Sequence, residues 1–227
     1  MPEGLLYDKL LCFPLFQGMG HDDLTEMFSH AKLEFCKLAE GKTVVREGEN
    51  CSLLHLLIDG ALRVETKSED GEYAVIEEVT APYVIQPECL FGLRLLSRSS
   101  FVTATNANLI TINKTEVALL CEEFLAFRLN LLNIIATKAQ LQFHMVWCRK
   151  PACLRERIIR FLVSHSLHPK GRKDVLIYME RLAVEVNDSR LNVSRELRAM
   201  QDDGLIKLSR GRIVIPLMEQ LLTVTER

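Results

Sequence analysis

Hydrophobic residues near the C-terminus follow a helical period that is interrupted once. The members of this stripe are Leu182, Val186, Val193, Leu197 and Met200. Between its two halves lies Asn187-Asp188-Ser189. These short polar side chains compete with a helix for backbone hydrogen bonds and favour a turn. The pattern therefore predicts two short helices that meet at a polar turn.

The second of these helices carries long polar side chains opposite its hydrophobic stripe. Ser189 is placed to cap its first turn. The side chains that we expect to point outward are Arg190, Asn192 and Arg195, with Arg198 as a further candidate. A helix-turn-helix presents its second helix to the major groove of DNA in this manner, with long donors near the helix N-terminus.

The residues that follow predict a basic hairpin. Asp203-Gly204 ends the helix, and two hydrophobic runs, Leu205–Leu208 and Arg212–Ile215, flank Ser209-Arg210-Gly211. Helix, polar turn, capped arginine-bearing helix and basic hairpin in this order indicate a winged helix-turn-helix that binds DNA. The alternative is a helical hairpin whose arginines are only solvated.

Upstream, the hydrophobic pattern has the period of strands. From Leu33 onward, short apolar or alternating runs are separated by turn residues, among them Asp59-Gly60 and Asp70-Gly71. Strands and turns at this spacing indicate a small barrel or a sandwich. Residues 1 to about 38 contain helical pieces, so we expect an α+β fold.

A long helix is predicted from Phe124 to the proline at position 151. Its first stripe steps by four and three through Leu125, Leu129, Leu132, Ala136, Ala139, Phe143 and Val146. A second apolar face consists of Leu131, Ile134 and Ile135. We interpret one face as packing on the strands and the other as packing on a second copy, the alternative being a helix that packs only on its own domain. Arg149-Lys150-Pro151 would then be the hinge.

The net charge changes sign at the predicted hinge. Residues 1–148 hold 12 Lys and Arg against 20 Asp and Glu, a net of −8, whereas residues 149–227 hold 16 against 10, a net of +6. A length of 227 residues allows two modest domains, each with its own core. A basic C-terminal module suits a phosphate backbone, and the acidic part is expected to stay away from the duplex.

The sequence shows no signal peptide and no apolar run long enough for a membrane span, so we expect a cytoplasmic protein without membrane partners. The seven cysteines, at positions 12, 36, 51, 89, 121, 148 and 153, are scattered. They are typical of reduced thiols in an intracellular protein. Cys148 and Cys153 are the one close pair; two soft ligands do not complete a zinc site, although a redox role stays open.

In the strand region the chain resembles the Crp/Fnr transcription regulators, relatives of the cyclic-AMP receptor protein. The resemblance is carried by residues 38–49, 54–64, 70–71 and 90–92, whose glycines fall where the β-roll of that family turns its corners. It extends through the helix-turn-helix. The family implies an N-terminal double-stranded, jelly-roll-like β-roll with the cyclic-nucleotide-binding-domain fold, a long dimerisation helix and a C-terminal winged helix-turn-helix. It also implies a bacterial source.

The effector chemistry of cyclic-nucleotide binders does not carry over. Those proteins place a glycine-glutamate pair and then an arginine-serine or arginine-threonine pair in the roll, whereas this chain has Gly92-Leu93 and Ser99-Ser100 at the matching positions. A cyclic phosphodiester without a cationic partner would bind poorly. We therefore treat Gly92, Leu93, Ser99 and Ser100 as pocket candidates for an unidentified signal that is not cyclic AMP.

We expect no cofactor and no metal ion. Cys12 and Cys36 are too isolated to resemble the clustered iron–sulfur ligands of the oxygen-sensing branch of the family. His55, inside an apolar run, is either a haem or metal ligand or a hydrogen-bonded core residue. A cupin-like metal enzyme is an alternative that requires paired histidines, and the six histidines contain no His-x-His motif.

The sequence thus predicts three segments: a sensor domain over residues 1–123, a dimerisation helix over 124–148 and a winged helix-turn-helix over 149–227. We expect a homodimer without enzymatic activity that binds an inverted repeat of double-stranded DNA, with half-sites about 34 Å apart. RNA polymerase is a further partner if the protein activates transcription. The DNA-binding candidates are Ser189, Arg190, Asn192, Arg195, Arg210 and Arg212. The remaining alternative is an interaction protein that does not bind DNA.

Overall fold

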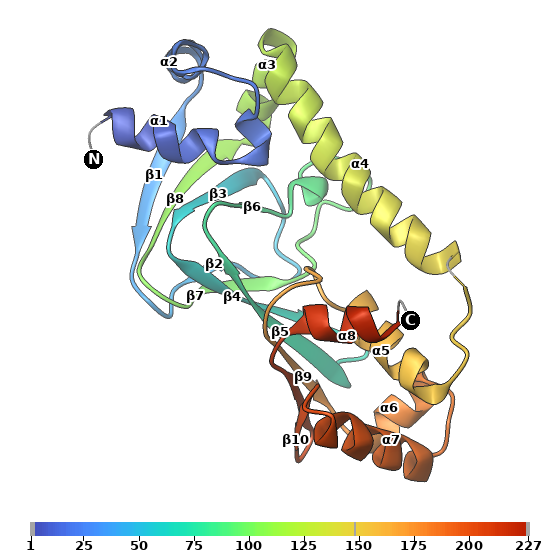
Figure 1. Cartoon of the computed structure of the whole chain (residues 1–227). Coiled ribbons are helices and arrows are strands. Elements are labelled where there is room, and N and C mark those ends of the chain that lie inside the picture. Colours follow the sequence, from blue (N-terminus) through green and yellow to red (C-terminus); the bar gives the residue numbers. More distant parts are fainter. Residues whose placement is uncertain (1–2, 148, 226–227) are drawn as a thin grey trace. The chain divides into compact units, whose positions relative to one another are not determined.

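The computed structural model describes residues 3–147 and 149–225. The chain forms two compact units (Figure 1). The first consists of Met1–Leu62 and Val79–Val146, and the second of Arg63–Glu78 and Trp147–Arg227. Each unit has its own hydrophobic core. The expected division into a sensor domain, a dimerisation helix and a winged helix-turn-helix concerns function and stays a prediction.

The first unit begins with short helices, continues with strands and ends with two helices. Its helices are α1 (Glu3–Leu11), the 3-10 turn η1 (Pro14–Phe16), α2 (His21–His30), the turn η2 (Pro87–Cys89), α3 (Lys114–Glu123) and α4 (Leu125–Trp147). Its strands are β1 (Leu33–Leu38), β2 (Thr43–Val45), β3 (Leu53–Asp59), β6 (Tyr83–Ile85), β7 (Ser100–Thr103) and β8 (Ala107–Asn113). The predicted order of helical pieces, strands and long helix is confirmed.

Four of these strands form an antiparallel sheet in the order β1-β8-β3-β6. One face of this sheet carries Leu54, Leu56, Ile110 and Ile112, which are buried together with Leu24 and other side chains of the helices. β2 pairs with β7. Two layers of short antiparallel strands with helices on one face are the expected β-roll.

Gly60 shows why the roll needs glycine at its corners. This residue joins β3 to β4 (Ala61–Lys67) with φ +92°. A Cβ atom there would lie 2.5 Å from the carbonyl oxygen of Asn106. Both the left-handed backbone and the close approach exclude a side chain.

The second unit combines part of a strand hairpin with the C-terminal elements. The hairpin strands are β4 and β5 (Tyr73–Thr80), of which residues 63–78 belong to this unit. The C-terminal elements are α5 (Leu154–Ser164), β9 (Lys173–Ile177), α6 (Met179–Glu185), α7 (Arg190–Asp202), β10 (Lys207–Ser209), β11 (Arg212–Ile215) and α8 (Met218–Thr225). Antiparallel pairing runs from β5 through β9 and β11 to β10.

The core of the second unit contains the whole stripe predicted for the helix-turn-helix. Leu182, Val193, Leu197 and Met200 are completely buried, and Val186 is 4% exposed. Val75 of β5 and Met218 and Leu221 of α8 belong to the same cluster. No helix in the described part of the chain is long and apolar enough to cross a membrane.

Candidate nucleic-acid interface

The polar turn between α6 and α7 has the geometry that the sequence predicted. Asn187 adopts φ 50°, a left-handed conformation that asparagine tolerates better than most residues. The backbone N–H of Asn192 donates to the hydroxyl of Ser189 over 3.2 Å, so Ser189 is the N-cap of α7. α7 ends at Asp202, and Gly204 follows with φ +75°.

Arginines of α5 hold this turn in place. One guanidinium nitrogen of Arg157 donates to the carbonyl oxygens of Val186 and Asn187, at 3.0 and 2.8 Å. Another donates to the carboxylate of Asp188. Arg155, also in α5, bonds Glu196 in the middle of α7 and Asp203 at its C-cap, and so holds the helix that follows the turn. Carboxylates of the C-terminal residues thus pair with Arg155 and Arg157, so these two positive charges are not free to attract DNA.

Hydrogen bonds depress the pKa of Asp188. The side-chain amide of Asn192 donates to Oδ1 over 2.9 Å, and the N–H of Ser189 donates to the same oxygen over 2.8 Å. These bonds, and then Arg157, favour the ionised carboxylate and lower its pKa. The ionised Asp188 therefore stabilises the turn just before α7, beside the N-cap Ser189.

The exposed face of α7 presents three of the predicted donors. Arg190 is exposed and its Nε lies 3.2 Å from a carboxylate oxygen of Glu180. Asn192 is exposed, although its amide is engaged with Asp188. Arg195 is exposed and forms no salt bridge within the residues that the structure describes. Free or weakly paired donors near a helix N-terminus match what base edges and phosphates require.

The wing is the hairpin β10–β11, in which Ser209 pairs with Arg212. Gly211 turns it with φ +68°, and a Cβ there would lie 3.2 Å from the ring of Tyr178. Arg210 at the tip is exposed. Arg212, by contrast, donates to Asp174 of β9 over 2.7 Å and is half-buried. The structure therefore leaves Arg210 accessible and ties Arg212 to the neighbouring strand.

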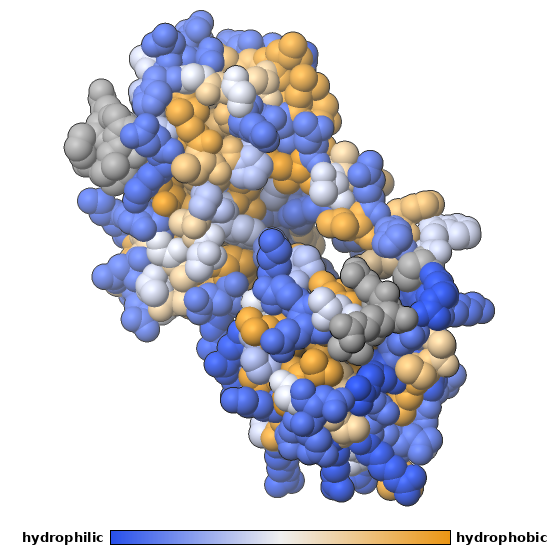
Figure 2. Space-filling view, viewed as in Figure 1, coloured by the Kyte–Doolittle hydropathy of each residue, from blue (hydrophilic) through white to orange (hydrophobic). Residues whose placement is uncertain are grey.

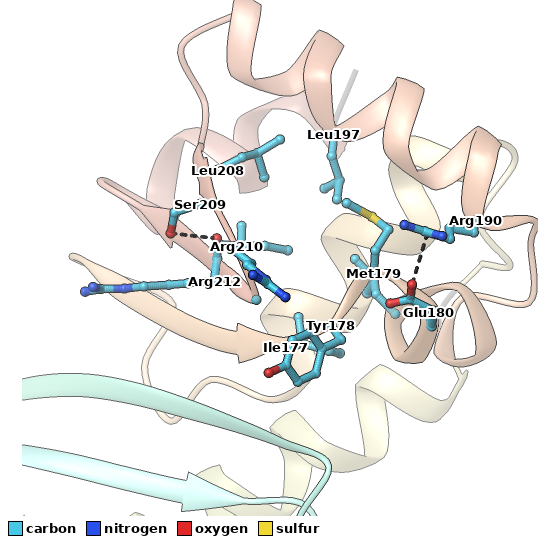
Figure 3. A pocket seen from close by; sticks show the side chains of 13 residues that line it. Ile177, Tyr178, Met179, Glu180, Arg190, Leu197, Leu208, Ser209, Arg210 and Arg212 are labelled. Carbon is cyan, nitrogen blue, oxygen red and sulfur yellow. Dashed lines mark hydrogen bonds and ion pairs between the residues drawn. The ribbon is translucent and has the colours of Figure 1, made fainter.

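A hollow of about 340 Å³ opens between the wing and the start of α7 (Figure 3). Tyr178, Glu180, Arg190, Arg210 and Arg212 line it together with hydrophobic residues. Figure 3 shows Arg190 and Glu180 joined by their ion pair on the helical side, with the wing opposite. On the face shown in Figure 2, hydrophilic side chains predominate over the part that holds α6 and α7. Sequence reasoning missed Tyr178 and Glu180, whose exposure no local pattern reveals.

The four pocket candidates in the roll differ in exposure. Leu93 is fully exposed, whereas Ser99 is fully buried. The hydroxyl of Ser100 accepts from the N–H of Glu47 over 3.0 Å, and Gly92 has φ +111°. None of the four lines the hollow of about 140 Å³ in the roll, which is bounded in part by His55 and Gln86. Ser97, which the sequence did not single out, donates to Gln86 over 2.6 Å in the buried part of this loop.

His55 lies in β3, and burial lowers its pKa, which favours the neutral ring. No cluster of three metal-binding side chains occurs in the described part of the chain. Of the predicted cysteine pair, Cys153 is exposed and reduced, and Cys148 lies outside the described residues.

Two family models match the chain. Residues 35–124 match the cyclic nucleotide-binding domain, and residues 156–224 match the Crp-like helix-turn-helix domain. The chain is significantly similar to none of the curated proteins.

Several solved structures share the fold. The catabolite activator protein of Thermus thermophilus aligns over 94% of this chain and 99% of its own, with 18% identity and a TM-score of 0.51. A protein described as a Crp/Fnr-family regulator from Eubacterium rectale aligns over 95% and 99%, with 20% identity and a TM-score of 0.52. The sensor domain of the regulator DNR from Pseudomonas aeruginosa aligns over 66% and 98%, with 16% identity and a TM-score of 0.53. At such identities the likeness is one of fold.

Proposed function

The chain belongs to the Crp/Fnr family of DNA-binding transcription regulators, and we propose that it acts as a homodimer on an inverted repeat of double-stranded DNA. In this proposal the two recognition helices α7 enter successive major grooves on one side of the duplex. Their separation sets half-sites about 34 Å apart. RNA polymerase would be a partner only if the bound dimer activates transcription.

The observation that carries the proposal is the exposed N-terminal face of α7. In this proposal the exposed Arg190 reads a guanine edge with two hydrogen bonds, and the exposed Asn192 and Arg195 contact a second base or phosphates. The hydroxyl of Ser189, at the N-cap, can also donate to a phosphate. Arg210 and Arg212 of the wing would position the backbone. Leu191 follows Arg190 and is exposed, so it can contact a thymine methyl group but accepts no hydrogen bond from cytosine.

Selection of random duplex DNA on the purified, ligand-free protein tests this assignment. We expect enrichment of an inverted repeat. Arg190→Ala should cost about 1–3 kcal/mol on that repeat and relax one position in each half-site. Lys170→Ala is the matched control, since it removes one exposed positive charge outside α7 and the wing.

The outcome of the selection separates two failures. A wild-type protein that enriches no sequence but binds duplex DNA at low salt needs a signal before it becomes specific. Absence of binding even at low salt contradicts the proposed DNA function and favours an interaction protein. An unchanged sequence preference in Arg190→Ala contradicts only the assignment of the reading residue.

We propose that two copies of the chain associate through α4, which has two apolar faces. Phe127 and Leu131 are buried in the core of the first unit. The other face exposes Leu125, Leu129, Leu132 and Phe143, each 49–65% exposed. An exposed apolar stripe with the four-and-three spacing of a coiled coil is stabilised by a second helix of the same kind.

We also propose that the signal is not cyclic AMP or cyclic GMP. The exposure of Leu93 and the burial of Ser99 support this, because a nucleotide phosphate requires accessible donors. Calorimetry with cyclic AMP and cyclic GMP is the direct test, and no heat of binding is expected. Saturable binding of either nucleotide would contradict the proposal.

A further inference from the structure

A cavity of about 660 Å³ lies in the first unit, away from the loop that holds the four pocket candidates. It is formed where α1 and α2 meet β1 and β8, and its volume falls in the range of sites for small molecules. We propose that this cavity binds a small, largely apolar molecule that carries one carboxylate. The binding is independent of the proposed DNA function.

The walls of the cavity are hydrophobic. Leu6, Ala31, Ile58 and Leu109 contribute aliphatic surface, and Phe28 and Phe35 contribute aromatic surface. Phe35 is 60% exposed although it stands on β1 opposite Ile110, which is fully buried. When a ligand covers exposed apolar surface in a concave site, the free energy falls, because that surface is removed from water.

Three polar groups at the cavity define the charge of the ligand. Lys37 and Asn108 are cross-strand neighbours in the β1–β8 register, so their side chains project from the same face of the sheet. Tyr7 reaches the cavity from α1. Within the part of the chain that the structure describes, the ammonium of Lys37 forms no salt bridge. The amide of Asn108 and the hydroxyl of Tyr7 likewise have no hydrogen-bond partner there.

A carboxylate satisfies this arrangement. The ammonium of Lys37 supplies the opposite charge, and the amide of Asn108 and the hydroxyl of Tyr7 supply two neutral donors. A cationic ligand would be repelled by Lys37, and a fully apolar one would leave the three groups unused. A few polar groups on an otherwise apolar wall are the usual composition of a site that orients a small molecule.

The cavity is held by contacts both around it and within its wall. Lys9 of α1 lies 3.2 Å from a carboxylate oxygen of Asp59, which ties that helix to β3. The ring of Tyr7 packs against His21 and Phe28, with centroids 5.7 and 5.5 Å apart. The site is therefore preformed, and little ordering opposes binding.

Titration calorimetry with decanoate tests the proposal, with decan-1-ol as the uncharged probe of the same chain length. Both are used below the concentrations at which they aggregate. We expect decanoate to bind the wild type at one site. Lys37→Met should weaken decanoate about five-fold, as expected for a partly exposed charged hydrogen bond, and leave decan-1-ol unchanged. Phe35→Ala should weaken both probes about three-fold through lost apolar contact.

Lys32→Met is the matched control, because Lys32 is exposed, precedes β1 and does not line the cavity. It should bind both probes as the wild type does. The lysines and Phe35 are exposed, so folding is retained and is checked by thermal unfolding. Absence of decanoate binding to the wild type overturns the proposal. Equal weakening of decanoate in Lys32→Met and Lys37→Met also overturns it. Neither result bears on DNA binding, which is measured without these probes.

Discussion

The ammonium of Lys173 lies 2.6 Å from the carboxylate of Glu77, and both side chains are 1% exposed. The two residues are partners in the register of β5 and β9. Glu77 also accepts from the backbone N–H groups of Leu167 and His168, and Lys173 donates to the carbonyl oxygen of Lys170 over 2.8 Å. A buried pair is tolerated only when such additional bonds satisfy both partners.

Removing one partner should therefore be more harmful than removing both. Glu77→Gln leaves the charge of Lys173 buried and should cost about 3–5 kcal/mol, whereas Glu77→Gln with Lys173→Met should cost less. Hydrogen exchange of the β5 and β9 amides, with urea unfolding, measures the difference. Glu78→Gln, the same change at an exposed neighbour, is the control. A single Glu77→Gln variant with wild-type protection would contradict the argument.

Glu180 is expected to moderate DNA binding. Its ion pair with Arg190 is exposed on both sides, so it contributes at most about 1 kcal/mol and is readily exchanged for a base contact. Glu180→Gln frees Arg190 and removes a negative charge beside the duplex. We expect affinity to rise about three-fold on all sequences, with the sequence preference kept. Fluorescence anisotropy against the selected repeat and a scrambled duplex measures both quantities.

The control for this variant is Glu122→Gln, an exposed carboxylate in α3 with the same change in net charge. If both variants raise affinity alike, net charge is the cause. If Glu180→Gln alone alters which bases are preferred, the ion pair helps to orient Arg190 for readout.

The helix-turn-helix could be predicted from sequence because its determinants are local. The stripe around Val193 and Leu197, the cap at Ser189 and the stop at Gly204 all act within a few residues. The alternation of the roll strands, and glycines such as Gly60, were equally visible. These features explain why the order of elements was predicted correctly.

Long-range pairings were not predictable in this way. Nothing near Glu77 indicates that its partner is Lys173, and the strand register that joins them links distant parts of the sequence. α8 was not predicted, because it is short and Met218 and Leu221 alone define no period. The pocket candidate Leu93 rested on family positions, whereas its complete exposure depends on how the loop folds. The ion pair of Arg212 with Asp174 was likewise not predictable, because its two residues are far apart in the sequence.

The two wing arginines should behave differently. Arg210 is exposed at the tip, and its loss should weaken all sequences alike and lower the slope of log affinity against log salt by about 1. Arg212→Ala should also weaken all sequences, but it breaks the bond to Asp174 and should loosen β11 from β9. Salt titrations with each variant, and hydrogen exchange of β11, separate the two effects. Equal salt slopes and equal protection would contradict this distinction.

Acid should weaken the α6–α7 turn through Asp188. Because its pKa is lowered in the folded state, Asp188 stabilises the fold above the ordinary pKa of an aspartate, and this stabilisation is lost as the pH falls through the lowered value. Asp188→Asn should thus be less stable than the wild type at about pH 6, with the difference shrinking as the pH falls through the lowered pKa of Asp188. Urea midpoints across this range measure it. Asp202→Asn, the same change at the exposed end of α7, is the control for the substitution itself.

The exposed stripe of α4 makes the most direct prediction about assembly. Leu129 and Leu132 are 49% and 56% exposed and lie on a different face from Leu131, which is buried. Leu129→Lys with Leu132→Lys should place charges in the proposed helix seam and give a monomer in sedimentation equilibrium. The monomer should keep weak binding to one half-site, since α7 is untouched, and lose the gain in affinity on the full repeat. Leu119→Lys, an exposed leucine of α3 that is 46% exposed, is the control and should leave the dimer intact. A double variant that sediments as a dimer would mean that the chains associate through another surface.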